Sequence, residues 1–297
     1  MLDFRVKTFL TVCRKLNYTH AAQELNLTQS AVSQHMAFLE RHYGVQLVRF
    51  EGKSMQLTEA GAMLCRAFQS FAHDELLLER KMRSVGSGKV RINVGMTLTA
   101  GEYIVAFPLA QYLSQRPDLQ VSLVSKSTEE LLDLMAKGDI DCAFLEGFFD
   151  KGELAWNALC TQELVCICAP SHPLAGQTVE FERLLEEPLV VREPKSGSRA
   201  VLEHALAQRN LTLTSFESVM EASSIGVIKA FVEAGQGISF VYEAAAAEQL
   251  ARGDLGRIRF NGPAITHEIS FVRPAGSLFE EEFARLFEGV ACRVLTA

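Results

Sequence analysis

The sequence lacks any apolar run that could cross a membrane. Its 297 residues contain no stretch close to the ~20 apolar residues that a bilayer-spanning helix needs. The opening Met1–Arg5 is not followed by the apolar core of a signal peptide. These absences predict a cytoplasmic protein with no membrane partner, and they disfavour a solute-binding protein of a transporter as an alternative.

The common catalytic signatures are missing as well. The sequence contains no GxSxG, HExxH or GxGxxG motif and no phosphate-binding loop, and its seven histidines are scattered. Asp139 and Asp141 could pair as carboxylates, but their place after Gly138 is more typical of a surface turn. We therefore expect no enzyme, no catalytic residues, no cofactor and no metal site.

Cysteines are few and irregularly placed. The seven cysteines form an odd number without regular spacing, which argues against a disulfide framework in a cytoplasmic chain. A thiol-based redox sensor using Cys160 and Cys166 remains an alternative. Such a sensor needs positive charge nearby to lower the thiol pKa, yet no lysine or arginine lies between Lys151 and Arg183 in sequence.

Charge is divided unevenly along the chain. Residues 1–58 carry seven basic and four acidic side chains, which leaves 22 basic and 32 acidic side chains for residues 59–297. Because neutralisation of phosphates is the general source of affinity for nucleic acids, this division favours DNA binding confined to the N-terminal end.

Residues 18–42 (YTHAAQELNLTQSAVSQHMAFLERH) follow the pattern of a helix-turn-helix. Ala22 allows two helices to approach closely, and Asn26 accepts the left-handed backbone that the turn requires. Val32 lies where a buried aliphatic residue is needed, and we expect Leu27 to help seal the corner.

The second helix of this motif has one apolar and one polar face. Thr28 is a good N-cap, and Val32, Met36 and Leu39 form an apolar stripe. The opposite face carries short uncharged polar side chains, which suit contacts with base edges in a major groove. Val45–Leu57 then predicts a two-stranded wing along the sugar-phosphate backbone. The predicted DNA-binding residues are Thr28, Gln29, Ser30, Ser33, Gln34, Arg49 and Lys53.

A long helix should follow, capped by Thr58. Its apolar residues are spaced by 4, 3, 7, 4 and 3 positions, which is a heptad seam and predicts dimerisation. Packing of the seam on its own domain is the alternative. The seam consists of Leu64, Phe68, Phe71, Leu78, Met82 and Val85. Gly86-Ser87-Gly88 ends the helix as a flexible joint.

Residues 89–297 alternate between strand and helix patterns, which predicts parallel sheets in two α/β lobes. The expected strands are Val90–Gly95, Leu119–Ser125, Cys142–Glu146, Leu164–Ala169, Leu189–Val191 and Ile238–Tyr242. The expected helices are Glu102–Gln115, Thr128–Lys137 and Arg199–Gln208.

Four strand-to-helix junctions are rich in hydroxyl groups: residues 95–99, 125–128, 196–199 and 221–224. In open α/β sheets, ligands bind at the carboxyl ends of strands, where helix N-termini present free N–H groups. Together with two nearby arginines, these junctions suit a small anion. From the residues alone, this argument selects Thr128, Arg192 and Ser224 among the candidates.

The run Phe4–Gly61, especially TQSAVSQHMAFLERHYGVQL and LTEAG, resembles the N-terminal domain of LysR-type transcriptional regulators. The resemblance continues along the whole chain. It implies a winged helix-turn-helix, a linker helix and a two-lobed effector domain like a type 2 periplasmic binding protein, in an α/β chain overall. It also implies that the chain crosses between lobes near Gln162–Leu164 and Thr266–Ser270. Phe50 stands where the family usually has arginine, which predicts a weaker grip of the wing on phosphates.

Two further segments, GMTLTAGEY at 95–103 and REPKSGSR at 192–199, resemble the subgroup of Calvin-cycle and cysteine/sulfite-responsive regulators. In that subgroup the corresponding loops hold small acids or inorganic oxyanions. The resemblance assigns effector binding here to Thr97, Thr99, Ser127, Ser196, Ser198 and Arg199.

The sequence as a whole predicts a sequence-specific transcriptional regulator that binds promoter DNA and a small anionic effector. The predicted domains are 1–58 for DNA binding, 59–88 for the linker helix and hinge, and 89–297 for the effector. Within the last, we expect lobe I at 89–162 and 268–297 and lobe II at 163–267. The resemblance also implies a homodimer or homotetramer that contacts RNA polymerase.

Overall fold

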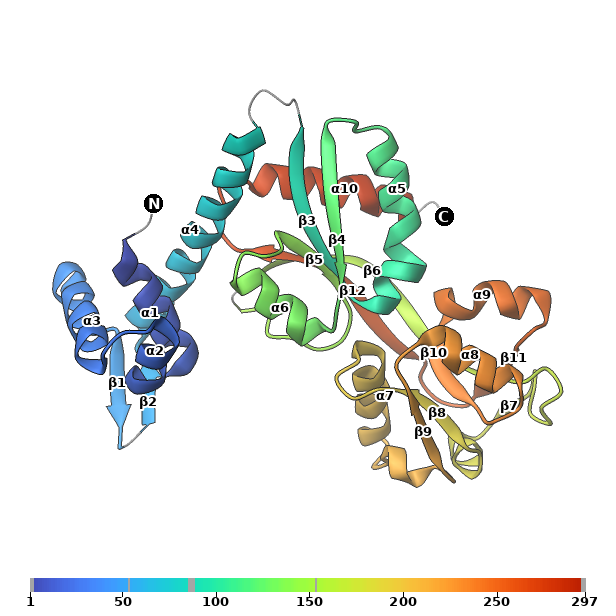
Figure 1. The fold of residues 1–297 in the computed structure, drawn as a ribbon. Helices are drawn as coiled ribbons and strands as arrows, with labels where there is room; N and C mark the ends of the chain where they lie inside the picture. The colour runs from blue at the N-terminus through green and yellow to red at the C-terminus, as the bar shows by residue number, and fades with distance from the viewer. Residues whose placement is uncertain (1–2, 53, 85–88, 153, 295–297) are drawn as a thin grey trace. The chain divides into compact units, whose positions relative to one another are not determined.

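The computed structural model describes residues 3–52, 54–84, 89–152 and 154–294 (Figure 1). The chain forms two compact units. Unit one comprises residues 1–88 together with 136–138 and 274–280, and unit two comprises residues 89–135, 139–273 and 281–297.

Unit one holds the N-terminal helices, a two-stranded sheet and a long helix. In chain order these are α1 (Phe4–Lys15), α2 (Tyr18–Leu25), α3 (Gln29–Tyr43), β1 (Val48–Glu51), β2 (Ser54–Leu57) and α4 (Glu59–Ser84). The strands pair antiparallel, with Val48 opposite Leu57. Gly52 begins the intervening turn with φ of 64°. Lys53 lies outside the described residues.

Helices α2 and α3 form the predicted helix-turn-helix. Asn26 ends α2 with a left-handed φ of 53°, and the Thr28 hydroxyl caps α3 by accepting from the Ala31 N–H at 3.2 Å. Leu27 does not seal the corner as predicted, since it is 40% exposed. Its backbone N–H turns inward to the Ala22 carbonyl at 2.9 Å, while its side chain remains at the surface.

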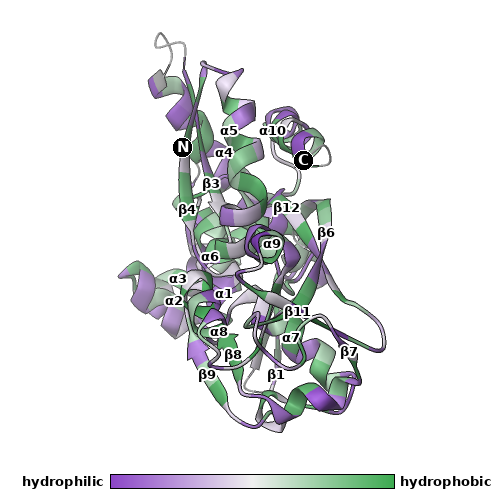
Figure 2. Cartoon of the chain, turned by 90° about the vertical axis from the view of Figure 1, so that its right-hand side faces the viewer, coloured by the Kyte–Doolittle hydropathy of each residue, from purple (hydrophilic) through white to green (hydrophobic). Residues whose placement is uncertain are grey.

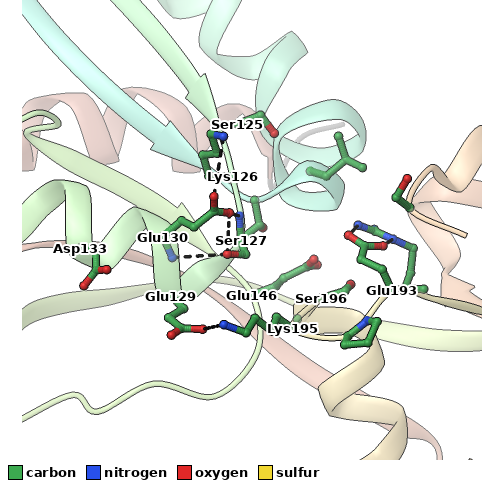
Figure 3. Close-up of a pocket in the computed structure, with 16 residues that line it drawn as sticks. Ser125, Lys126, Ser127, Glu129, Glu130, Asp133, Glu146, Glu193, Lys195 and Ser196 are labelled. Carbon is green, nitrogen blue, oxygen red and sulfur yellow. Dashed lines mark hydrogen bonds and ion pairs between the residues drawn. The ribbon is translucent and has the colours of Figure 1, made fainter. Parts of the chain in front are cut away.

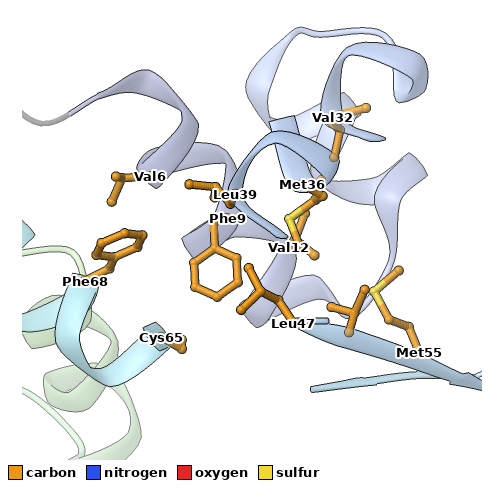
Figure 4. Packing of buried hydrophobic residues seen from close by; sticks show 13 residues of the cluster. Val6, Phe9, Val12, Val32, Met36, Leu39, Leu47, Met55, Cys65 and Phe68 are labelled. Carbon is orange, nitrogen blue, oxygen red and sulfur yellow. The ribbon is translucent and has the colours of Figure 1, made fainter. Parts of the chain in front are cut away.

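The core of unit one is built from α1, α3, the sheet and the start of α4. Val32, Met36 and Leu39 are buried as the apolar stripe predicts, and they share a cluster with Phe9 and Val12 of α1 (Figure 4). The apolar face of α3 is thereby fixed, so its polar face must point away from the core.

The predicted seam on α4 is divided in the structure. Phe68 is buried in the cluster just described, and Leu64 packs against it. Phe71, Leu78 and Met82 are 50%, 48% and 66% exposed. The first part of the seam therefore packs on its own unit, as the alternative interpretation proposed. Val85 lies outside the described residues.

The segment 274–280 belongs to unit one because α4 binds it directly. The Asp74 carboxylate accepts from the Ser277 hydroxyl at 2.5 Å and from the Leu278 N–H at 2.8 Å. Asp74 and Ser277 are both buried.

Unit two is an α/β structure around one extended sheet. Its strands are β3 (Val90–Met96), β4 (Leu119–Ser125), β5 (Cys142–Leu145), β6 (Leu154–Cys168), β7 (Thr178–Val179), β8 (Leu189–Arg192), β9 (Val219–Ala222), β10 (Ser239–Tyr242), β11 (Gly256–Phe260) and β12 (Ile265–Pro274). Its α-helices are α5 (Ala106–Ser114), α6 (Thr128–Ala136), α7 (Gly197–Ala207), α8 (Ile225–Glu233), α9 (Glu243–Arg252) and α10 (Glu280–Val294). Short turns of other helix types are η1 (Ala100–Val105), η2 (Phe181–Glu186) and η3 (Leu213–Ser215). Hydrophobic and hydrophilic residues alternate around helices such as α5 and α10 (Figure 2).

The sheet runs in the order β4-β3-β5-β12-β6-β11-β7, with β10 also paired to β6, and β8-β9 form a separate parallel pair. We call the part around β3, β4 and β5 lobe I and the part around β7 to β11 lobe II. The predicted parallel sheets are only partly correct: β3 is parallel to β4 and β5, but β12 and β10 pair antiparallel with their neighbours. The mixture arises because β6 and β12 are long strands shared by both lobes.

Two predicted elements have different bounds for reasons of local structure. The helix expected from Glu102 begins earlier, as a π-type turn at Ala100, before α5. The strand expected from Leu164 begins at Leu154, because β6 extends across both lobes.

Candidate functional sites

A cleft of about 640 Å³ lies between the two lobes of unit two (Figure 3). We call it the inter-lobe cleft. Residues of lobe I that line it are Thr97, Leu98, Ser125, Lys126, Ser127, Glu129, Glu130, Asp133 and Glu146. Residues of lobe II that line it are Arg192, Glu193, Pro194, Lys195, Ser196, Gly197 and Ser223.

The cleft forms where parallel strands end. Thr97 follows β3, Ser127 follows β4, Glu146 follows β5 and Arg192 is the last residue of β8. Because the carboxyl ends of neighbouring parallel strands meet at one edge of a sheet, side chains distant in sequence converge here.

Arg192 lines the cleft and has one donor nitrogen without a partner in the described structure. Its Nε and Nη2 donate to the two carboxylate oxygens of Glu193, each at 2.8 Å. Its Nη1 is buried and has no hydrogen-bond partner among the described residues. The guanidinium is thus fixed in orientation by Glu193, with one donor left for a ligand.

Several hydroxyl groups of both lobes are buried as well. Thr97 and Thr99 are 2% and 1% exposed, and neither hydroxyl has a hydrogen-bond partner within the described part of the chain. Ser196 and Ser198 are also buried, and their hydroxyl oxygens lie 3.1 Å apart. Since a buried polar group without a partner destabilises the fold, these groups indicate a site that a ligand or water completes.

Glu146 is the main residue that sequence reasoning missed. It is 2% exposed, and its Oε2 atom has no hydrogen-bond partner in the described structure. Burial raises its pKa to about 7, while Thr99, Arg192 and the backbone N–H of Ser198 lower it. Thr99 is close enough to influence the carboxyl although its hydroxyl does not reach hydrogen-bond geometry. A carboxyl directly after a buried strand, in CAFLEG, was the signal available in the sequence.

Five predicted effector residues do not line the cleft, namely Thr99, Thr128, Ser198, Arg199 and Ser224. Thr99 and Ser198 are buried. Thr128 donates to the Glu146 backbone carbonyl at 2.7 Å. Arg199 is held by Glu203, Glu221 and the Arg192 carbonyl. Ser224 caps α8, and its neighbour Ser223 lines the cleft in its place. Thr128, Arg199 and Ser224 therefore bind neighbouring groups of the protein instead of lining the cleft.

The mouth of the cleft is more acidic than the predicted anion site suggested. Glu129, Glu130 and Asp133 line it from α6. Lys195 of lobe II pairs with Glu129 of lobe I at 2.9 Å, as the dashed line in Figure 3 shows. Of the basic residues that line the cleft, Arg192 is buried, whereas Lys126 and Lys195 are exposed and pair with acidic residues of α6.

The candidate DNA interface lies on α3 and the wing. Gln29, Ser30, Ser33 and Gln34 are all exposed on the face opposite the core. Thr28 also serves as the cap, and its hydroxyl lies 3.0 Å from that of Ser30. This face offers hydrogen-bonding groups without net charge.

Arg49 of the wing is partly engaged within the protein. It pairs with Glu51 at 3.2 Å and donates to Gln56 at 3.0 Å, although its side chain is 59% exposed. Phe50 is 60% exposed and makes an edge contact with the Tyr18 ring at 6.3 Å. The wing therefore presents one partly neutralised cation among its described residues.

The two cysteines considered as a redox sensor, Cys160 and Cys166, do not have the environment that such a sensor needs. Burial raises the pKa of Cys160, Cys166 and Cys168, opposite to the lowering that a reactive thiolate requires. Cys160 and Cys166 lie on the continuous strand β6, so their six-residue separation is about 20 Å. A disulfide between them would need the strand to unfold, since bridged Cα atoms lie within about 7 Å.

Two negative findings apply to the described residues. No group of histidine, cysteine and acidic side chains there could hold a metal ion. No helix there has the length and apolar character to span a membrane.

Comparison with known proteins identifies both units. A sequence model of the bacterial regulatory helix-turn-helix protein, lysR family, matches residues 5–62, and one of the LysR substrate binding domain matches residues 86–291. The chain is 30% identical to the uncharacterized HTH-type transcriptional regulator YeiE of Escherichia coli K12, over 86% of this chain and 85% of the relative. It is 28% identical to the HTH-type transcriptional regulator CysL of Bacillus subtilis, over 90% and 89%.

Further relatives support the same conclusion. The RuBisCO operon transcriptional regulator of Allochromatium vinosum is 31% identical, over 80% of this chain and 78% of the relative. Among solved structures, a peroxide-bound OxyR variant of Corynebacterium glutamicum matches with a TM-score of 0.63 at 24% identity, covering 99% of this chain and 92% of the other. That identity establishes a shared fold only.

Proposed function

Because the chain belongs to the LysR family of bacterial transcriptional regulators, we propose that a small anionic metabolite or inorganic oxyanion in the inter-lobe cleft controls its activity. The chain is a DNA-binding regulator with an effector domain rather than an enzyme. The names CysL and RuBisCO operon regulator confirm the predicted subgroup.

The observation that carries the proposal is a set of buried donors without partners in the described part of the chain. Arg192 and Thr97 line the cleft, and Thr99 interacts with Glu146, which also lines it. Arg192 Nη1 and the hydroxyls of Thr97 and Thr99 are buried without hydrogen-bond partners among the described residues. All three can donate, and an anion that accepts from them removes the cost of leaving them unpaired. Charge-assisted bonds from an arginine suit oxyanions and carboxylates in particular.

The position of the site explains how a ligand can regulate. Lobe I contributes Thr97 and Ser127 to the cleft, whereas lobe II contributes Arg192 and Ser196. A ligand that touches both lobes binds one arrangement of them more tightly than another, and this difference in affinity shifts the population of lobe arrangements.

DNA recognition is assigned to the exposed polar face of α3, with Gln29, Ser30, Ser33 and Gln34 reading base edges. The exposed part of the α4 seam, Phe71–Met82, supports association with a second copy as a homodimer or homotetramer. Action on promoter DNA together with RNA polymerase, in the cytoplasm, completes the proposal.

The alternative of a thiol-based sensor receives no support from the geometry. The candidate thiols have raised pKa values, and two of them lie far apart on one strand. The likeness to OxyR extends to the fold alone.

Thermal unfolding of the full chain tests the anionic effector. The panel comprises sulfate, sulfite, thiosulfate, phosphate, O-acetylserine and short organic acids. A ligand at about 100 times its Kd adds about 2.7 kcal/mol of stability, which shifts the melting temperature by several degrees. The Arg192→Met variant should lose that shift.

Arg252→Met is the matched control, because Arg252 is 57% exposed on α9 and outside the cleft. It should respond as the wild type does. If no anion stabilises the wild type, or if Arg192→Met responds normally, the anionic effector at this site is wrong.

A further inference from the structure

Glu146 places an acidic side chain directly beside the proposed anion donors. Its carboxyl follows β5 in lobe I and faces Arg192 of lobe II, which lowers its pKa through charge. The two lobes meet tightly here: a Cβ on Gly197 would lie 2.5 Å from Glu146 Cγ and 2.9 Å from the Glu146 carbonyl oxygen. The side chain is therefore packed against the first turn of α7 and has little room to turn away from the cleft.

The charge balance around this carboxyl is unfavourable for an anion if Glu146 is ionised. Glu193 binds Arg192 through both carboxylate oxygens, so the arginine charge is already compensated. An ionised Glu146 would make this trio of side chains net negative. A second anion placed against it in a buried site would meet strong repulsion.

We propose that Glu146 is a specificity-determining residue whose neutral carboxyl donates a hydrogen bond to the bound anion, so that effector binding takes up one proton. This inference rests on the proposed function, since it requires an anion in the inter-lobe cleft. It adds that the effector must accept hydrogen bonds from a carboxylic acid as well as from an arginine and hydroxyls.

The unpaired Oε2 atom supports this role. It is buried and lacks a partner among the described residues, as do Arg192 Nη1 and the hydroxyls of Thr97 and Thr99. Four polar side chains from both lobes thus have unused hydrogen-bonding capacity in one buried place. An anion satisfies the arginine and the hydroxyls at once, and it satisfies Glu146 only when the carboxyl carries a proton.

Glu146 is the group that changes charge near neutral pH, because the titratable groups that face it keep one charge state there. Arg192 of β8 is a guanidinium and stays charged throughout. Burial is the largest influence on the pKa of Glu193 and raises it, but the hydrogen bonds and charge of Arg192, the backbone and the charge of Arg199 together lower it below its usual value, so Glu193 stays ionised. Tyr242 of β10 interacts with Glu146, and burial raises its pKa, so it stays neutral. Thr99 and the Ser198 N–H, which complete the surroundings, do not titrate.

The consequence is a defined pH dependence of affinity. With a pKa of about 7, Glu146 is mostly protonated at pH 6 and mostly ionised at pH 8.5. If only the protonated form accepts the anion, affinity falls by roughly thirtyfold between these values and levels off at the acidic end.

The test is titration calorimetry of the full-length protein with sulfate, thiosulfate and methanesulfonate at pH 6 and pH 8.5. These probes do not change their own charge in this range, so any change in affinity belongs to the protein. At pH 7.5, titrations in triethanolamine and in Tris, two cationic buffers whose ionisation enthalpies differ, measure the protons taken up without adding a competing oxyanion. Since about three quarters of Glu146 is ionised at pH 7.5, we expect uptake of about 0.75 proton per bound anion.

Variants assign the proton to Glu146. Glu146→Gln keeps a donor without a titrating group, so it should bind the same probe with affinity that does not vary with pH. Glu217→Gln is the matched control, because Glu217 is exposed and does not line the cleft. It should keep the wild-type dependence. The buffer comparison on the wild type holds even if Glu146→Gln fails to fold.

The outcomes separate this inference from the proposed function. Binding of a probe with unchanged affinity at both pH values and no proton uptake overturns the role of Glu146 and leaves the anion site intact. Binding of none of the probes at either pH, in a protein that also fails to respond to the wider anion panel, overturns both. Tighter binding at pH 8.5 would show that the anion binds while Glu146 is ionised, and this too overturns the inference.

Discussion

The α3 face and the inter-lobe cleft present their polar side chains in opposite states of burial. Gln29, Ser33 and Gln34 on α3 are exposed, and water satisfies their hydrogen bonds when DNA is absent. Thr97 and Arg192 in the cleft are almost fully buried, with donor atoms that have no partner within the described residues.

This difference determines what each site can recognise. A hydrated face gains only the difference between bonds to bases and bonds to water, so it selects among sequences by small increments. A buried, unsatisfied site gains the full benefit of each new bond, and it rejects ligands that leave one group unpaired. The α3 face is therefore suited to distinguishing DNA sequences by small differences in affinity, whereas the cleft is suited to strict selection of a small ligand.

The largest difference between the two sites should be in how a substitution changes the pH dependence of the free energy of unfolding. The folded-state pKa of Glu146 is about 7, above its usual 4.5, so the folded protein holds a proton that the unfolded chain has released. Stability is therefore lost as pH rises from about 4.5 through 7, and the loss is complete above 7. The free energy of unfolding of Glu146→Gln relative to wild type should rise by about 3 kcal/mol across this window.

Urea unfolding at a series of pH values measures this difference. Gln29→Ala serves as the comparison on α3, because no titrating group is removed, and its difference from wild type should be flat with pH. A flat difference for Glu146→Gln as well would show that Glu146 is ionised equally in both states.

The next effect concerns sequence discrimination by α3. Gln29→Ala should reduce the preference for the specific operator by about 1–3 kcal/mol, since a base-edge contact is lost. Affinity for random DNA should change little, because phosphate contacts are unaffected. Binding isotherms on the two DNAs at one salt concentration provide the measurement, and an equal loss on both would remove Gln29 from base reading.

A smaller effect is expected for the hydroxyl of Thr99. Thr99→Val removes the hydroxyl at nearly constant shape, so anion affinity should fall about fivefold, or about 1 kcal/mol. The ligand-free protein should be as stable as wild type or more so, because a buried unpaired group has been removed. Thr99→Ser keeps the hydroxyl and is the control. Reduced stability without ligand would mean that the hydroxyl is satisfied in the free protein.

The smallest effect should occur at the wing. Glu51→Gln frees Arg49 from its ion pair, which is exposed and therefore weak. Affinity for specific and random DNA should rise together by roughly twofold, or about 0.5 kcal/mol, since a phosphate contact carries no sequence information. A change confined to the specific site would contradict the role of Arg49 as a phosphate contact.

Local sequence patterns predicted the helix-turn-helix of unit one well. The turn at Asn26, the cap at Thr28 and the stripe at Val32 and Met36 depend on neighbours within a few residues, and the structure contains all of them. The prediction that Leu27 is buried was wrong, because its exposure depends on how the turn is oriented against α1 and α2. The prediction that the α4 seam serves dimerisation was partly wrong, because Phe68 packs in the core of unit one rather than against a second helix.

The location of the cleft was predictable from the sequence, but the full set of side chains that line it was not. The rule that ligands bind at strand ends found Thr97, Ser127, Arg192 and Ser196. It could not tell Ser223 from Ser224, because one residue decides whether a side chain faces the ligand or caps the helix.

The sequence by itself determined the family, the helix-turn-helix and the strand ends at which a ligand could bind. These follow from short-range periodicity, capping and turn chemistry, which the order of residues encodes directly. Only the tertiary structure decided that β6 and β12 join the lobes into a mixed sheet, and that Glu146 lies buried beside Arg192. The reason is physical: burial and charge pairing between residues 46 positions apart depend on how the strands pack, and those contacts in turn set the protonation of the cleft.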